Sequence, residues 1–243
     1  MQRSGARKLT RQRLEADLAA VADPERAGNS AWFFKTGKGQ YGEGDRFLGI
    51  RVPVQRKIAL QYRGLPLKDI AHLLASKFHE HRLVGLEILV AQYERGSEPD
   101  RENIFSFYLQ HTACVNNWDL VDASAPYIVG AHLRTRPRDV LYALARSALV
   151  WDRRIAIVAT FAFIRIGDLK DTYRIADMLL ADKHDLIQKA TGWALRETGK
   201  VSRPALLSFL REHYASLART TLRYAIEHFP PEERRRILAG EFS

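Results

Sequence analysis

The chain has 243 residues, of which 46% are hydrophobic and 27% are charged, and it contains one cysteine. These values are normal for a globular domain with a sizeable core, and no apolar run is long enough to cross a membrane. The formal net charge of +10 indicates a polyanionic partner, usually DNA or RNA, although some basic proteins bind neither. A lone Cys114 excludes an intramolecular disulfide and fits a reducing cytoplasm; we expect it to be a buried apolar residue.

The N-terminal segment, residues 1–13, is rich in Arg and Lys and has no apolar stretch of the kind found in secretory signals. Two acidic residues follow at once, which argues against a transit peptide. We expect residues 1–13 to be a flexible basic extension. An amphipathic helix carrying Leu14, Leu18 and Val21 should follow it.

Helical spacing of apolar residues dominates the rest of the chain. Asp23 followed by Pro24 is typical of an N-cap and the first residue of a helix. The further predicted helices span residues 54–61, 67–75, 83–95, 101–111, 119–133, 139–148, 153–166, 171–181, 186–198, 203–213, 217–228 and 232–239. One short alternating run, Phe47–Val52, predicts an extended connector. The predicted fold class is therefore all-α.

A glycine-rich segment spans residues 37–45, with four glycines in eight residues. Such a composition is incompatible with a helix interior and predicts a flexible loop. Its backbone N–H groups could approach a phosphate, but a plain connecting loop is an equally good interpretation. The segment lacks the spacing and the Lys-Ser/Thr ending of a P-loop, so it does not support nucleotide hydrolysis.

An internal repeat appears when the bulky or basic residues at helix starts are aligned. Arg82, Trp118, Arg154 and Lys189 are spaced by 36, 36 and 35 residues, and a degenerate copy starts near Thr221. A period near 35 residues with two helices per repeat is typical of an α-solenoid of HEAT-like repeats. Any all-α protein with short loops repeats roughly in this way, but here the apolar pattern also stays in phase.

Equivalent positions in such repeats line one concave face. Trp118 and Arg154 occupy the first position of their repeats, and Asp122 and Trp193 lie four residues further along theirs. Residues four apart share a helix face. We therefore expect these four side chains to converge on one wall from three successive repeats.

Four segments carry a resemblance to a known family. They read DRFLGIRVP at 45–53, NWDLVD at 117–122, WDRR at 151–154 and QKATGWALRE at 188–197. In these segments the chain resembles the AlkD-type DNA alkylation-repair glycosylases, from about Phe33 to the C-terminal helices. The resemblance implies a stack of HEAT-like helical repeats with a basic concave groove that binds duplex DNA.

The resemblance also implies an activity and a set of site residues. The family releases N3- and N7-alkylated purines, such as 3-methyladenine and 7-methylguanine, without flipping the base into a pocket as most enzymes that act on bases do. By motif, Asp122 is the catalytic carboxylate and Trp118 and Trp193 pack against the deoxyribose and backbone. Arg154 binds phosphate beside the carboxylate. Phe33 stands where the family usually has a tyrosine that approaches the lesion.

The chemistry of the reaction explains why one carboxylate suffices. An N-alkylated purine is already cationic, so it leaves as a neutral base without a general acid, and positive charge develops on the sugar. A carboxylate about 4 Å away stabilises that charge by about 4 kcal/mol, which is about a thousandfold in rate. It can also orient the attacking water. Each tryptophan face adds about 0.5–2 kcal/mol near a cationic sugar.

Further side chains are assigned by position. Basic residues expected to contact DNA phosphates are Arg51, Arg153, Arg154, Lys189 and Arg196, together with Lys35 and Lys38. Trp151 is expected in the core, and Asp119 suits a first-turn acid at a helix N-terminus. The histidines are scattered without paired spacing, so no metal site and no cofactor are expected.

The sequence leaves two other classes of function open. One is a HEAT-repeat module that binds DNA or RNA without catalysis, and the other is a scaffold for protein interactions. Our prediction is a single HEAT-like repeat domain over residues 1–243. It would act as a monomeric glycosylase on alkylated double-stranded DNA in the bacterial cytoplasm, associated with the nucleoid, without contact to a membrane.

Overall fold

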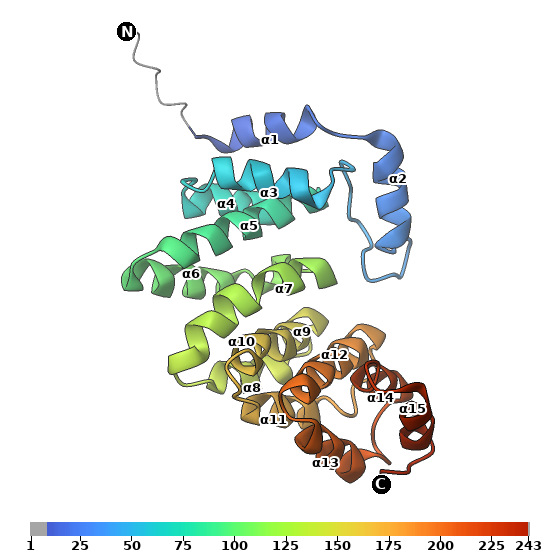
Figure 1. The fold of residues 1–243 in the computed structure, drawn as a ribbon. Coiled ribbons are helices and arrows are strands. Elements are labelled where there is room, and N and C mark those ends of the chain that lie inside the picture. Colours follow the sequence, from blue (N-terminus) through green and yellow to red (C-terminus); the bar gives the residue numbers. More distant parts are fainter. Residues whose placement is uncertain (1–8, 243) are drawn as a thin grey trace. The chain divides into compact units, whose positions relative to one another are not determined.

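The computed structural model describes residues 9–242, which fold into helices and turns (Figure 1). The only β-type pairing among them is an isolated bridge between Arg46 and Phe78. The prediction of an all-α fold built from HEAT-like helical repeats is therefore confirmed. No helix in the described part of the chain is long and apolar enough to span a membrane.

The chain divides into two compact units, residues 1–124 and 125–243, named here the N-terminal and C-terminal units. The prediction of one domain over 1–243 stays a prediction, as does the basic concave groove. The N-terminal unit contains α1 (Arg11–Ala19), α2 (Pro24–Phe33), α3 (Val52–Gln61), α4 (Leu67–Leu74), α5 (His79–Arg95), α6 (Glu98–Gln110), the 3-10 turn η1 (Thr112–Cys114) and α7 (Trp118–Ser124).

The N-terminus differs in part from its prediction. Residues 1–8 of the expected flexible extension lie outside the described residues. Helix α1 already begins at Arg11, because the Thr10 side chain accepts a hydrogen bond from the backbone N–H of Arg13 and caps it. Leu14 and Leu18 are fully buried, as expected for an amphipathic helix, whereas Val21 lies beyond the end of α1 and is exposed.

Helix α5 is the core of the N-terminal unit. It packs against α3, α4, α6 and α7, and its apolar residues from Leu83 to Leu89 are buried. Gly85 faces α4, where an added Cβ would lie 3.3 Å from the Cβ of Leu73. The first turn of α5 is polar but equally buried, and it carries the side chains that organise the site described below.

The glycine-rich segment forms turns between α2 and α3, as predicted, and residues 47–51 run as an extended connector. The buried Glu80 carboxylate fixes this connector by accepting hydrogen bonds from the backbone N–H groups of Leu48, Gly49 and Ile50 at 2.9, 2.8 and 3.3 Å. Gly49 has a φ of +77°, and a Cβ there would lie 2.1 Å from the Asp23 carbonyl oxygen, so only glycine fits.

The C-terminal unit contains the π-helical turn η2 (Pro126–Gly130), the 3-10 turn η3 (Leu133–Thr135), α8 (Asp139–Ala145), α9 (Val150–Ala159), α10 (Phe161–Ile164), α11 (Lys170–Met178), α12 (Asp185–Val201), α13 (Arg203–His213), α14 (Arg219–Ala225) and α15 (Pro231–Leu238). Helix α12 is its centre and packs against α9, α11, α13 and α14. In Figure 1, the C-terminal helices α12 to α15 are drawn in orange to red.

Two predicted long helices are interrupted. The helix expected over 119–133 is regular only to Ser124, because Pro126 lacks a backbone N–H and the chain continues as a π-helical turn. The helix expected over 153–166 divides at Thr160, whose hydroxyl donates to the Ile157 carbonyl at 2.6 Å. Trp151 is 5% exposed, which confirms its place in the core, whereas Cys114 is half-buried and the expectation of a buried cysteine is wrong.

Helices α12 and α14 approach closely at Gly192, where an added Cβ would lie 2.5 Å from the Tyr224 Cβ and 2.6 Å from the Thr221 carbonyl oxygen. We expect Gly192→Ala to force the helices apart and lower the free energy of unfolding by about 1–3 kcal/mol, measured by urea denaturation. Gly28→Ala in α2 is the control. Its Cβ meets nothing within 4 Å, so it should be neutral or slightly stabilising. Equal urea midpoints for Gly192→Ala and wild type would contradict the described packing.

Candidate functional site

Trp118, the first residue of α7, lies on a stack of aromatic rings in the N-terminal unit. The Phe34 ring is stacked against its indole, with centroids 5.4 Å apart and an interplanar angle of 18°. Phe34 in turn stacks on Phe47 at 5.1 Å, and the edge of Phe33 meets Trp118 at 6.0 Å. Phe33 and Trp118, which the sequence analysis assigned to one site from distant segments, are therefore neighbours. Phe33 is 56% exposed and Trp118 is half-buried.

A buried histidine supports this stack. His79, at the start of α5, is 2% exposed, and its ring lies 4.8 Å from both Phe34 and Phe47. Its Nε2 lies 2.7 Å from the Asp119 carboxylate, directly after Trp118 in the chain. Its Nδ1 lies 3.3 Å from the Asp45 carboxylate. The imidazole thus joins α5 to α7 and to the end of the glycine-rich loop.

A second cation completes the arrangement. The Arg82 guanidinium, one turn along α5, donates to the same Asp45 oxygen at 2.6 Å. Positive and negative groups therefore alternate along this network, in the order Arg82, Asp45, His79 and Asp119. This alternation offsets the free-energy cost of removing each charge from water. Asp119 does lie in the first turn of α7, as expected, but its carboxylate also binds the histidine. No group of three potential ligands in the described part of the chain has the geometry of a metal site.

The charge states in this network follow from its geometry. Burial lowers the pKa of His79, but hydrogen bonds to Asp119 and Asp45 and the charge of Asp119 outweigh burial and raise the pKa to about 9. Burial raises the pKa of Asp45, but the hydrogen bond from His79 and the nearby positive charges outweigh it, so that pKa is lowered. At neutral pH, His79 is therefore an imidazolium held between two carboxylates.

His79, Asp45 and Arg82 were not among the residues predicted for the site. One signal was present: residues 79–82 read His-Glu-His-Arg at the start of a helix whose remainder is apolar. Such a polar run has to be hydrogen-bonded when it is buried. Its partners lie some 30 to 40 residues away along the chain, so periodicity does not identify them.

Asp122 lies one turn beyond Trp118 on α7 and is half-buried. Because residues four apart lie on one face of a helix, the carboxylate and the indole occupy the same side of α7. The action of these two residues as one site stays a prediction.

In the C-terminal unit, Trp193 is half-buried on α12, and its ring packs against Phe161 with centroids 4.4 Å apart. Arg154 on α9 is only 5% exposed, and its Nη1 donates to the Leu186 carbonyl at 2.8 Å. This guanidinium therefore ties α9 to the first turn of α12, the helix of Trp193, and its contact with a phosphate stays a prediction. Trp118 and Asp122 belong to the other unit, so convergence of all four residues on one wall stays a prediction.

Two more residues predicted to bind phosphate form hydrogen bonds or ion pairs with groups of the protein itself. Arg153 donates through Nε to Asp182 at 2.7 Å, and its Nη1 binds two backbone carbonyls. Arg196 pairs with Glu227 and is largely buried. Both guanidinium groups are held by internal partners, and their contact with DNA phosphates stays a prediction. Lys189 pairs with Asp185 at 2.7 Å but keeps a partly exposed side chain.

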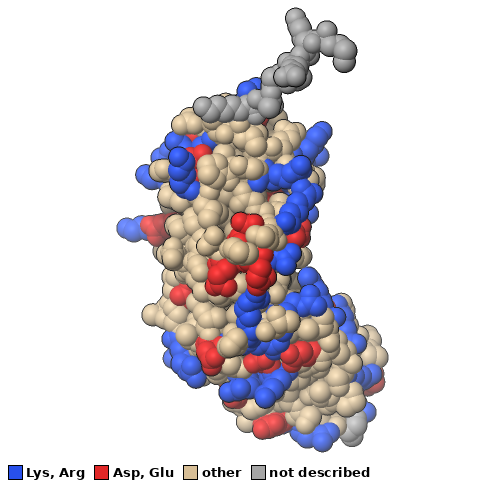
Figure 2. Space-filling view, turned by 90° about the vertical axis from the view of Figure 1, so that its left-hand side faces the viewer, with Lys and Arg blue, Asp and Glu red and all other residues tan. Residues whose placement is uncertain are grey.

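Three other predicted DNA contacts are exposed in the N-terminal unit. Lys35 and Lys38 lie on the turns after α2, and Arg51 is the residue before α3. All three are accessible to a phosphate from solvent. On the face drawn in Figure 2, groups of Lys and Arg side chains alternate with acidic groups, so the positive charge is not spread evenly over that face.

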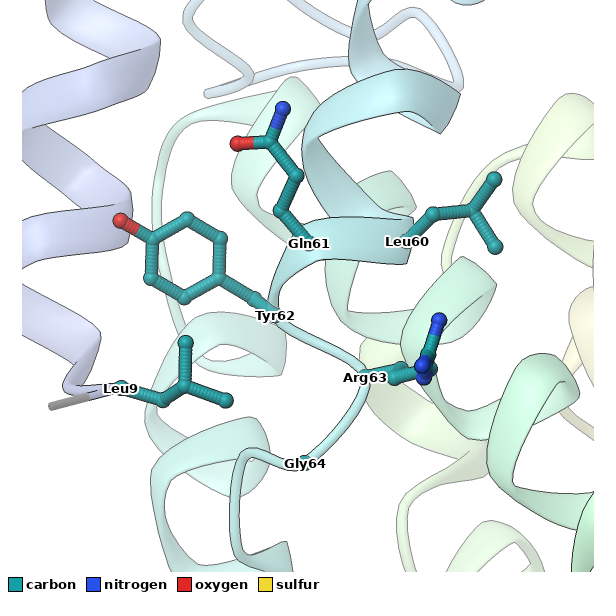
Figure 3. A pocket seen from close by; sticks show the side chains of 6 residues that line it. All are labelled: Leu9, Leu60, Gln61, Tyr62, Arg63 and Gly64. Carbon is teal, nitrogen blue, oxygen red and sulfur yellow. The ribbon is translucent and has the colours of Figure 1, made fainter. Parts of the chain in front are cut away.

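A surface pocket of about 560 Å³ in the N-terminal unit lies apart from these residues (Figure 3). Its lining residues are Leu9, Leu60, Gln61, Tyr62, Arg63 and Gly64. The Tyr62 ring points toward α1, where its hydroxyl donates to Asp17 at 2.6 Å. No residue predicted for the site lines this pocket, and it contains no carboxylate.

The fold and these residues define a class of protein: an all-α helical-repeat protein with a half-buried tryptophan packed on other aromatic rings and a carboxylate one turn away. A family model described as "DNA alkylation repair enzyme" matches residues 14–229. The chain therefore belongs to the family of DNA alkylation repair enzymes.

A solved structure described as a predicted DNA alkylation repair enzyme from Enterococcus faecalis has the same fold, with a TM-score of 0.65. The two sequences are 18% identical, and the match covers 86% of this chain and 97% of that one. At this identity the likeness concerns the fold alone. A comparison with curated proteins found no match.

Proposed function

We propose that the protein is a DNA glycosylase that excises cationic N3- and N7-alkylated purines, such as 3-methyladenine and 7-methylguanine, from duplex DNA without flipping the base. Membership of the alkylation-repair family supports the substrate class. The observation that carries the proposal is the pairing on α7 of a half-buried indole, stacked on Phe34, with the Asp122 carboxylate one turn away. The proposal includes a monomer acting on DNA in the bacterial cytoplasm.

The supported indole suits a reaction in which charge develops on a sugar. The stack of Phe34 and Phe47 fixes the plane of the Trp118 ring, so little side-chain entropy is lost when a deoxyribose packs against it. Its negative face stabilises the oxocarbenium-like sugar as the bond to the base breaks. Asp122 supplies the full negative charge for the same ion and orients the attacking water.

The remaining roles divide between phosphate binding and support. Lys35, Lys38 and Arg51 are the exposed cations we assign to DNA phosphates in the N-terminal unit, and Lys189 in the C-terminal unit can exchange its Asp185 partner for a phosphate. Arg154 is assigned a positioning role, since it holds the first turn of the helix that carries Trp193. Trp193 itself is proposed to pack against the lesion strand.

The experiment that tests the activity uses a duplex with a single 7-methylguanine. The protein is incubated with it, and the free base is quantified by chromatography against a protein-free sample, because this lesion also depurinates slowly by itself. We expect release well above that background. Trp118→Ala should slow it by about threefold to thirtyfold, the range of one lost cation–π contact. Duplex binding without any release above background would overturn the proposal in favour of a non-catalytic DNA-binding module.

A further inference from the structure

The last turn of α2 carries three consecutive aromatic residues that point in different directions. Successive residues on a helix are rotated by about 100°. Phe34 points inward and packs against Phe47 and Trp118, and Phe33 meets Trp118 edge-on. Trp32 points outward and is 84% exposed, the highest value among the exposed large hydrophobic side chains of the described residues. Nothing in the proposed reaction uses this indole.

The charge around Trp32 indicates the kind of ligand that would cover it. Residues 26–42 contain three basic residues and no acidic one. Arg26 is held by Asp23 and by the Gly49 carbonyl, but Lys35 and Lys38 are exposed. Lys35 has a φ of +54°, and its carbonyl accepts a hydrogen bond from Gly42 at 3.1 Å, so the turn is defined rather than a random coil.

An exposed indole beside two exposed cations suits a ligand with a flat aromatic face and an anionic backbone. The Glu43 carboxylate, which accepts a hydrogen bond from the Gly39 N–H at 2.7 Å, offsets part of the positive charge of this loop. A nucleobase on a DNA strand has both features, and stacking on aromatic side chains is the usual way in which proteins hold an unpaired base. Within an intact duplex every base is already stacked on both sides. An indole therefore gains a contact only where one step of the duplex is open.

We propose that Trp32 is a base-stacking residue: its indole stacks on a DNA base that has lost its pairing partner, while Lys35 and Lys38 bind the adjacent phosphates. The proposal rests on the DNA-binding part of the proposed function. Phe33, the next residue in the chain, lies 6.0 Å from Trp118, so Trp32 belongs to the helix turn that flanks that indole. The site would favour duplexes with an open step, such as one opposite an abasic position.

The test compares two fluorescently labelled duplexes, one intact and one with a single tetrahydrofuran abasic analogue, by fluorescence anisotropy. We expect Trp32→Ala to weaken binding of the abasic duplex about tenfold, or about 1.4 kcal/mol, and binding of the intact duplex less than twofold. Trp32→Phe should retain most of the affinity because it keeps an aromatic face. Trp32→Leu, which is apolar but cannot stack, should behave like Trp32→Ala.

Two controls accompany these variants. Ile166→Ala removes another exposed apolar side chain, 50% exposed and in the C-terminal unit, and should bind both duplexes as wild type does. A 2-aminopurine placed opposite the abasic analogue reports stacking directly. Its fluorescence should fall when the wild type or Trp32→Phe binds and stay high with Trp32→Leu. Because Trp32 is exposed, all variants should melt at the wild-type temperature.

Each outcome decides the proposal. Unchanged affinity of Trp32→Ala for both duplexes would overturn it and point to another partner, such as a protein. Wild-type affinity of Trp32→Leu would also overturn it, because burial of an apolar side chain rather than stacking would then explain the binding. An equal loss of affinity on both duplexes would overturn it too. Failure of the proposed glycosylase is a separate result: no release of 7-methylguanine, combined with the Trp32 effect on the abasic duplex, would leave base stacking standing.

Discussion

Asp122→Asn should lower the rate of 7-methylguanine release about a thousandfold while leaving the affinity for the duplex unchanged. The substitution keeps the size of the side chain and removes only its charge. A carboxylate about 4 Å from the developing sugar cation is worth about 4 kcal/mol at an effective dielectric near 20. In the bound substrate the positive charge lies on the alkylated base, and in the transition state it moves onto the sugar beside Asp122. The attraction is therefore stronger in the transition state and appears mainly in the rate rather than in the binding constant.

Single-turnover release and duplex binding by anisotropy, measured on the same preparations, check this expectation. Asp139→Asn is the matched control. Asp139 is an exposed first-turn acid of α8, so its substitution raises the net charge by the same amount without touching α7. Both variants should bind DNA alike, since general attraction to phosphate depends on net charge. A rate for Asp122→Asn within tenfold of wild type would show that another group stabilises the sugar.

Replacing His79 with glutamine should remove a pH-dependent part of the stability of the N-terminal unit. The pKa of His79 is raised from 6.5 to about 9 because, although burial lowers it, its bonds to Asp119 and Asp45 favour the cation more strongly. A group whose pKa is raised in the folded state makes its full contribution to the stability of the fold at a pH below its unfolded pKa. That contribution decreases as the pH rises toward the folded pKa. The contribution is therefore complete below pH 6.5 and lost by about pH 9. Its size is on the order of 3 kcal/mol.

The measurement is the difference in unfolding free energy between wild type and His79→Gln across pH 6–9.5. That difference should shrink as the pH rises. Burial raises the pKa of Glu87 to about 7, despite its bond with Arg56, so Glu87 titrates in the same pH window. Because it does so in both proteins, its effect cancels in the difference. Asp45 does not interfere, since its pKa is lowered and its contribution is lost only in acid.

His81→Gln provides the control for a second buried histidine on the same helix. Burial lowers the pKa of His81, so that group is already neutral above pH 6.5. Its difference from wild type should stay constant above about pH 7.5, where the histidine is neutral in both the folded and the unfolded state. If the His79→Gln curve ran parallel to the wild-type curve, His79 would not be the charged centre of the network.

The network also bears on the proposed chemistry, because it fixes the start of α7. Asp119 holds the imidazolium, the imidazolium contacts Phe34 and Phe47, and Phe34 supports the indole of Trp118. These contacts preorganise the ring before DNA arrives, which is how a protein avoids losing free energy by ordering a side chain on binding.

Local sequence determined most of the secondary structure and part of the site. Helical spacing located most helices to within a few residues, but it missed the interruptions within 119–133 and 153–166. Asp23 does cap α2, and Trp151 is in the core. Both Trp118 and Asp122 do lie on one helix, four residues apart. These properties depend on residues within one or two turns of each other, and the period of 3.6 residues records them directly.

Only the tertiary structure decided which polar groups are already in use. Arg153, Arg154 and Arg196 stand at positions that suit phosphate binding, but partners 29 to 32 residues away hold the first two, and Glu227 holds the third. His79 became the centre of the site through Asp45 and Asp119, 34 and 40 residues away. Hydrogen bonds and ring contacts of this kind join segments that are far apart in the sequence, and no periodic pattern identifies such pairs. The packing of the helices determines which of these groups meet.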